Sequence, residues 1–201
     1  MSTTLRPSLI GTSRLEAFSD GVLAILITIM AFQLVPPDGG RLADLRDVLP
    51  DVLAFALSFV FLGIYWNNHH HLFRATERID AAVMWANLGL LFALTLIPGA
   101  TAWLASHHGE TGPTALYGFI ALASGAAYWI LARCIIRANP ESEVAARIGR
   151  DRKGLISLVL YAAGTGLAFV NPYLGIAIYV ATSILWIVPD RRLADVELSE
   201  D

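Results

Sequence analysis

Ionisable and polar residues stand where a long apolar segment begins, close to the amino terminus. Arg14 and the run Phe18-Ser19-Asp20 precede residues 21–35, in which Thr28 and Gln33 are the only polar side chains. Charged groups are costly in the hydrocarbon of a bilayer, so they pair with neighbouring helices and mark functional positions. We interpret Arg14, Ser19 and Asp20 as residues that fix this segment to its neighbours in a membrane.

A second polar cluster occupies residues 66–74, where three consecutive histidines follow two asparagines. Consecutive residues of a helix point about 100° apart, so adjacent histidines cannot readily bind one ion as an i, i+4 pair can. We therefore expect no metal site here. We expect the helical stripe of Asn67, His70 or His71, and Arg74 to hydrogen-bond to the polar end of the first segment. Asn68, His69 and His70 are the expected supporting polar cluster.

Composition places the whole chain in a membrane. Its 201 residues are 56% hydrophobic and 15% charged, and the mean hydropathy is +0.59, which predicts an all-α polytopic membrane protein. One cysteine, Cys134, excludes an intrachain disulfide. We find no nucleophile beside a base, no carboxylate pair, no phosphate-binding loop and no nucleic-acid motif, so we expect neither an enzyme nor a nucleic-acid partner.

Six apolar segments predict six transmembrane helices, judged against the roughly 20 residues that a helix needs to cross a bilayer. They cover residues 15–35, 48–73, 79–106, 114–136, 155–170 and 172–188. Pro98-Gly99 predicts a kink in the third helix, and Asn171-Pro172 predicts a tight hairpin before the last. The fifth segment is the shortest.

The basic residues predict the orientation. All lysines and arginines except Arg41 and Arg46 fall on one side of the six segments, which the positive-inside bias makes the cytoplasmic side. We expect an N-terminal arm (1–12) and a C-terminal tail (191–201) in the cytoplasm, joined by a six-helix domain (13–190). The basic stretch 147–153 would contact anionic lipid.

The first predicted helix carries an apolar stripe. Ser13 and Glu16 fit a capping box at its start. At 100° per residue Phe18, Ile25 and Phe32 fall on one line, with Thr28 and Ile29 beside it.

Arg14 and Asp20 cannot pair with each other inside this helix, because they lie about 120° apart around it. Asp20 also points about 140° away from Ile25. We therefore expect Arg14, Ser19 and Asp20 to bind the helix to neighbouring helices. The apolar stripe would then line a separate surface or path.

At this point the sequence resembles the transmembrane protein 175 family of potassium channels, found in lysosomes and in bacteria. The family signature Arg-x-x-x-Phe-Ser-Asp is present as Arg14, Phe18, Ser19 and Asp20. Matching residues continue along most of the chain: Tyr65-Trp66, Asn68-His69-His70, Phe73, Asn87, Pro98 and Trp186.

The resemblance implies a bacterial member with one six-helix repeat, where animal members have two, in the inner membrane. It further implies a homotetramer with the first helices around the pore, so that Ile25, Ile29 and Phe32 line a hydrophobic constriction and Thr28 forms the layer linked to potassium preference. Phe32 replaces the commoner leucine of the family. The expected ligand is permeating potassium, without a cofactor.

Because the sequence has no Thr-Val-Gly-Tyr-Gly loop, backbone carbonyl rings cannot select potassium, and we expect the channel to be weakly selective.

Two functions other than a channel remain as alternatives. A proton or cation transporter could instead use Asp20 and the histidines of the second helix as a relay. An intramembrane enzyme built on those histidines is the other rival.

Overall fold

The computed structural model describes residues 11–74, 76–141 and 152–187. Throughout these ranges the regular elements are helical, which confirms the all-α prediction. The elements are α1 (Thr12–Phe32), the 3-10 helix η1 (Leu42–Arg46), α2 (Leu49–Arg74), α3 (Ala81–Thr95), α4 (Ile97–Ser106), α5 (Thr111–Ala138), α7 (Arg152–Ala168) and α8 (Pro172–Ile187). Most of the N-terminal arm, the C-terminal tail and most of the basic stretch 147–153 lie outside the described residues.

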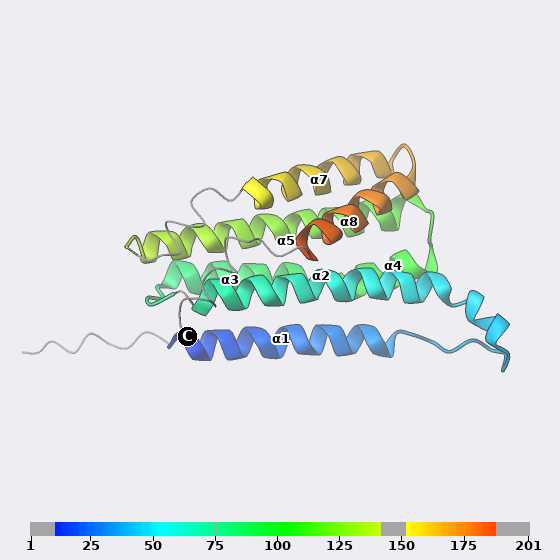
Figure 1. The fold of residues 1–201 in the computed structure, drawn as a ribbon, viewed down its shortest axis with the longest axis horizontal. Helices are drawn as coiled ribbons and strands as arrows, with labels where there is room; N and C mark the ends of the chain where they lie inside the picture. Colours follow the sequence, from blue (N-terminus) through cyan, green and yellow to red (C-terminus); the bar gives the residue numbers. More distant parts are fainter. Residues whose placement is uncertain (1–10, 75, 142–151, 188–201) are drawn as a thin grey trace, which may run out of the picture.

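The long helices lie side by side along one axis, as in a membrane-spanning bundle (Figure 1). Four helical segments are long and apolar enough to cross a bilayer: α1, α2, α3 with α4, and α5. The last two helices match the fifth and sixth predicted segments, but they have 17 and 16 residues, fewer than the roughly 20 of a full span. The protein is thus a multi-pass membrane protein, and a count of six spans stays a prediction.

The third predicted helix is interrupted two residues before its proline. α3 ends at Thr95 and α4 begins at Ile97. Pro98 has no N–H to donate to the Leu94 carbonyl and its ring would clash with that carbonyl. The α-helical pattern is therefore interrupted at Leu96, whose N–H reaches Ala93 O at 3.2 Å.

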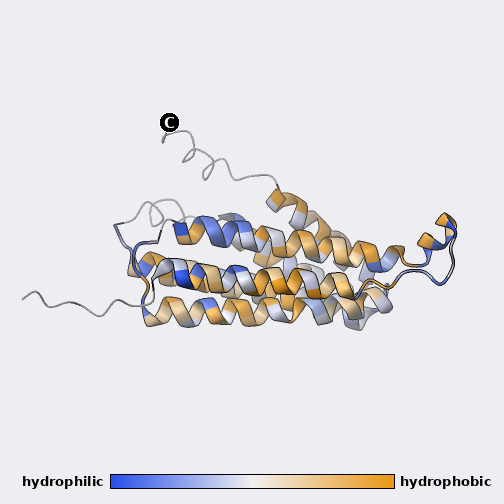
Figure 2. Cartoon of the chain, turned by 90° about the horizontal axis from the view of Figure 1, so that it is seen from below, coloured by the Kyte–Doolittle hydropathy of each residue, from blue (hydrophilic) through white to orange (hydrophobic). Residues whose placement is uncertain are grey.

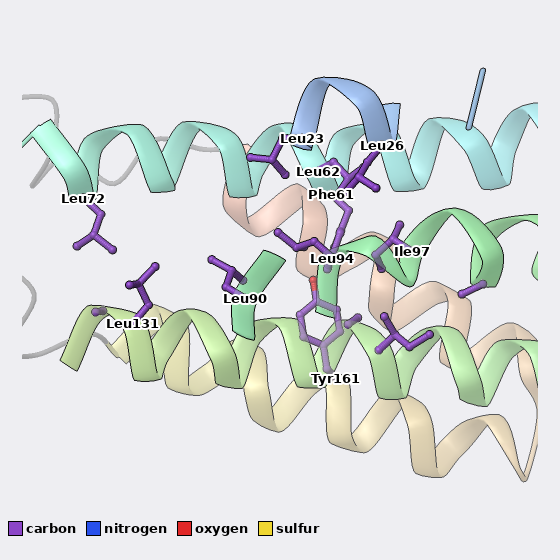
Figure 3. Close-up of a cluster of buried hydrophobic side chains, with 14 of the residues drawn as sticks. Leu23, Leu26, Phe61, Leu62, Leu72, Leu90, Leu94, Ile97, Leu131 and Tyr161 are labelled. Carbon is purple, nitrogen blue, oxygen red and sulfur yellow. The ribbon is translucent and has the colours of Figure 1, made fainter. Parts of the chain in front are cut away.

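Hydrophobic residues predominate along the middle of the bundle, and hydrophilic residues gather at its two ends (Figure 2). Leu23 and Leu26 of α1 reach the same buried cluster as Phe61 and Leu62 of α2 (Figure 3). Residues of α3, α4, α5 and α7 join the cluster: Leu90, Leu94, Ile97, Leu131 and Tyr161. One face of α1 is thereby anchored in the common core.

The last two helices form the predicted hairpin at Asn171-Pro172. Asn171 caps α8 through its side-chain oxygen, which accepts from the Tyr173 N–H at 2.9 Å. At the other end, Trp186 Nε1 donates to Ser157 Oγ of α7 at 2.7 Å. The bond from Trp186 to Ser157 ties the end of α8 to α7.

The predicted capping box at the start of α1 is wrong. The helix begins at Thr12 after Gly11, with no side-chain cap, and Ser13 lies inside it. The Glu16 carboxylate is 2.8 Å from His70 Nδ1 of α2. Glu16 thus bonds a neighbouring helix, and Ser13 is not at the N-cap position that a capping box requires.

Candidate functional site

α1 has a buried face and an exposed face. The buried face consists of Leu15, Ser19, Leu23, Leu26 and Met30. The opposite face carries large apolar side chains that protrude from the protomer: Phe18 is 54% exposed, Ile25 58%, Ile29 44% and Phe32 88%. Their spacing of three, four or seven residues places them on one stripe.

All four predicted pore residues lie on this exposed face. Thr28 is the one hydroxyl among Ile25, Ile29 and Phe32, and its Oγ1 donates to Ile25 O at 2.9 Å. Because its proton is used within the helix, the outward side of the Thr28 oxygen can accept but not donate. A contiguous exposed apolar patch marks a surface that meets lipid or another protein.

A chain of hydrogen bonds holds the buried face of α1 to α3 and α2. Ser19 Oγ donates to Leu15 O at 2.9 Å, so it must accept the bond from Asn87 Nδ2, also 2.9 Å long. The orientation of the Asn87 amide follows, because its Oδ1 is then left to accept from His69 Nε2 at 2.8 Å. Ser19 and Asn87 are completely buried, and His69 is 1% exposed.

A second tie joins α1 to α2 nearer the helix ends. Glu16 and His70 are both half-buried and meet at 2.8 Å. Trp66 stacks on the His70 ring, with centroids 6.2 Å apart. Glu16 was not among the site residues predicted from the sequence. Its position three residues before Ser19, on the same face of the helix, could have indicated that it contacts a neighbouring helix.

The predicted polar cluster of α2 divides between two neighbours. His69 and His70 serve α1, the first of them through Asn87. Asn68 Nδ2 donates to Ile64 O of its own helix. The backbone carbonyl of Asn68 accepts a hydrogen bond from the Tyr128 hydroxyl of α5 at 3.2 Å.

Two buried side-chain atoms of this region have no hydrogen-bond partner among the described residues. They are Asp20 Oδ1 and His69 Nδ1. Arg14 is exposed, and no bond or ion pair to it is found within the described part of the chain. We expect Asp20 to pair with Arg14 of an adjacent helix or with the histidines of α2, and this pairing stays a prediction.

The histidines of α2 do not converge on a common point, since His69 and His70 bond partners on different helices. Among the described residues no group of three His, Cys, Asp or Glu side chains could hold a metal ion.

Sequence reasoning missed a further polar cluster in the opposite half of the bundle. Ser58 of α2 lies 2.7 Å from Thr101 of α4 and 3.1 Å from the Tyr117 hydroxyl of α5. Thr101 also approaches Met30 Sδ of α1 at 3.8 Å. Isolated hydroxyls within apolar segments were the only signal for these contacts.

The sequence matches a known protein family. The family model described as endosomal/lysosomal potassium channel TMEM175 matches residues 14–98, which run from the polar start of α1 to the beginning of α4. That range holds Ser19, His69, His70 and Asn87.

Bacterial relatives extend the similarity over nearly the whole chain. A potassium channel of Chryseobacterium sp. (strain P1-3) is 45% identical over 181 residues, covering 90% of this chain and 94% of the relative. A potassium channel of Streptomyces collinus is 37% identical over 179 residues, covering 83% and 86%. The human endosomal/lysosomal proton channel TMEM175 is 35% identical over 95 residues, which are 41% of this chain and 18% of the human one.

A solved structure shares the fold. It is the crystal structure of a lysosomal potassium-selective channel TMEM175 homolog from Chamaesiphon minutus, with a TM-score of 0.78 and 29% identity. The match covers 88% of this chain and 96% of that one.

The hydrogen-bond chain through Asn87 yields a stability prediction. Asn87→Leu should lower the free energy of unfolding by about 1 to 3 kcal/mol, because Ser19 and His69 lose a buried partner. Thermal unfolding of the purified protein in detergent measures this. The matched control on the same helix is Thr95→Val, since Thr95 is exposed and bonds Phe92 O. Equal unfolding midpoints for the two variants would contradict the assigned role.

Proposed function

This chain belongs to the TMEM175 family of potassium channels, and we propose that four copies of it assemble around α1 as a weakly selective potassium channel of a bacterial inner membrane. The family resemblance inferred from Arg14, Phe18, Ser19 and Asp20 is thus confirmed. The family consists of ion channels, so the chain is not an enzyme.

The exposed stripe on α1 carries the proposal. Ile25, Ile29 and Phe32 protrude from the protomer although α1 is anchored in the core by its other face. Thr28 places a hydroxyl oxygen on this stripe in the middle of the segment, where lipid tails offer nothing for it to bind. Four such faces around one axis would instead enclose a path with a hydroxyl layer between apolar rings.

The stripe also suggests the character of the pore. Rings of Ile25, Ile29 and Phe32 would form an apolar constriction that empties of water when narrow and admits partly hydrated cations when wider. The Thr28 hydroxyl oxygens would offer the only side-chain acceptors at this level. Such a lining discriminates less between cations than rings of backbone carbonyls do.

Assembly would satisfy the groups left over in the protomer. Within the described ranges, one buried oxygen of Asp20 is unpaired, and the side chain of Arg14 is exposed on the same helix without an ion pair. The two lie about 120° apart around α1, so each needs another helix. In a ring of α1 helices, Arg14 of one copy can approach Asp20 of the next and pin the helices together.

One repeat per chain supports the tetramer. The chain covers 94% of the Chryseobacterium relative and 96% of the Chamaesiphon chain, so it matches nearly the full length of both. A single α1 cannot enclose a pore, and several copies must contribute one each.

The bias of basic residues adds an orientation with both termini in the cytoplasm and the η1 end outside.

Proton movement is the second candidate, since animal relatives are named proton channels. Asp20 Oδ1 and His69 Nδ1 are buried and unpaired, as a relay would require. The chain from His69 through Asn87 ends at the Leu15 carbonyl on the buried face of α1, which favours a structural role for it. A channel passes current down a gradient, whereas a transporter shows saturable, coupled flux.

Ile25→Asn tests the constriction. The change should raise the unitary conductance several-fold and lower the preference for potassium over sodium, because an amide ring stays hydrated where an isoleucine ring does not. Recordings from the protein reconstituted in planar bilayers measure both. Val159→Asn is the control, since Val159 is exposed on α7. Currents unchanged in Ile25→Asn would show that the stripe does not line the pore.

Thr28 should determine the weak preference of the pore for potassium over sodium. Thr28→Val keeps the shape of the side chain but removes the oxygen, so the permeability ratio of potassium to sodium should fall towards one. Thr28→Ser retains the oxygen and should preserve the ratio. Reversal potentials under bi-ionic conditions give the ratio, and equal values for the valine and serine variants would refute this role.

A further inference from the structure

A long apolar groove runs between α2 and α8. Its volume is about 640 Å3, and it lies where α8 crosses obliquely towards α2 (Figure 1). Leu53, Leu57 and Val60 line it from α2, and Val180 and Ile184 line it from α8. The volume is in the range of roughly 300 to 1,000 Å3 that is typical of ligand sites.

The length of the groove matches one leaflet of a bilayer. Its α2 wall extends from Leu49 to Val60, which at 1.5 Å per residue is about 16 Å. The hydrocarbon core of a bilayer is about 30 Å thick. An extended acyl chain of one leaflet therefore fits along it.

The groove is polar at one end. Arg46 of η1, His108 of the loop after α4, and Tyr173 at the start of α8 lie there. His108 Nδ1 bonds Ala105 O at 3.3 Å, which leaves the other ring nitrogen of His108 for a ligand.

Arg46 is the cation of this end that is free to bind an anion. Arg41, its neighbour in the chain, is held by Asp44 at 3.2 Å. No bond or ion pair to Arg46 is found in the described ranges. A guanidinium at the mouth of an apolar groove is the complement of a phosphate attached to a hydrocarbon chain.

We propose that the groove binds a phospholipid of the leaflet on the Arg46 side, with one acyl chain between α2 and α8 and its phosphate on the Arg46 guanidinium. A helix from a second copy would match the apolar walls but would cover Arg46 without supplying an anion, which is costly. The site depends on the protein residing in a membrane and not on the proposed pore.

Photochemical labelling tests the site. The full-length protein is reconstituted in vesicles of phosphatidylglycerol that contain a small fraction of the same lipid with a diazirine in its acyl chain. After illumination, the labelled peptides are identified by mass spectrometry. Labels should concentrate on residues 53–60 of α2 and 176–184 of α8. Labels spread evenly over all lipid-facing helices would overturn the proposal.

Two variants with matched controls make the test specific. Ala56→Trp puts an indole into the groove from an exposed position and should abolish labelling there, whereas Phe59→Trp, on the same helix outside the groove lining, should not. Arg46→Gln should reduce labelling about fivefold, as expected for the loss of one cation at a membrane surface. Arg41→Gln should leave it unchanged.

The same variants distinguish the other occupant. If the groove receives a second copy of the chain, Ala56→Trp should change the oligomeric mass in detergent while labelling of the groove is absent already in the unaltered protein. That result would overturn the lipid site. Labelling that is equal in Arg46→Gln and Arg41→Gln would also overturn it, because the phosphate contact would then be missing.

Discussion

Ser19 has to find hydrogen bonds in a place that water does not reach, and the arrangement of α1 follows from how it does so. Its hydroxyl donates to Leu15 O and accepts from Asn87, which in turn accepts from His69. A buried polar group without a partner costs more than the bond itself gains. These hydrogen bonds therefore fix the rotation of α1 about its own axis. In that rotation the side chains of Ile25, Thr28, Ile29 and Phe32 face outward.

The outward stripe does not by itself bring copies together. Lipid tails are as apolar as isoleucine, so an apolar helix face gains little hydrophobic free energy by leaving lipid. Close packing and polar contacts must hold such an assembly. Arg14 and the unpaired Asp20 oxygen supply polar groups at one end of the stripe, so assembly and the line of the pore would depend on the same helix.

Periodicity and composition were sufficient for much of this architecture. The all-α class, the approximate positions of the six apolar segments, the hairpin at Asn171-Pro172 and the stripe of α1 all follow from patterns within one segment. The family signature at Arg14, Phe18, Ser19 and Asp20 identified the kind of protein. These features are local, since each depends on the residues of a single helix or turn.

Contacts between segments were harder to predict. Glu16 satisfies a capping pattern on paper, but His70 lies within reach only after α1 and α2 have packed. Asn68 and His69 are adjacent in the chain yet serve α5 and α3, because 100° of helix separates them. The cluster of Ser58, Thr101 and Tyr117 joins three helices, and no single segment contains its pattern.

The most direct test of the account measures distances between copies of α1 in the assembled protein. A spin label is attached at Phe32→Cys in a Cys134→Ser background, and pulsed dipolar spectroscopy is recorded in lipid nanodiscs. Val159→Cys on α7 is the reference site. Phe32 labels should give two short distances, in the ratio of the side to the diagonal of a square, and both should be shorter than those at Val159. Phe32 distances longer than the Val159 distances would place α1 at the periphery, facing lipid, and would contradict the pore.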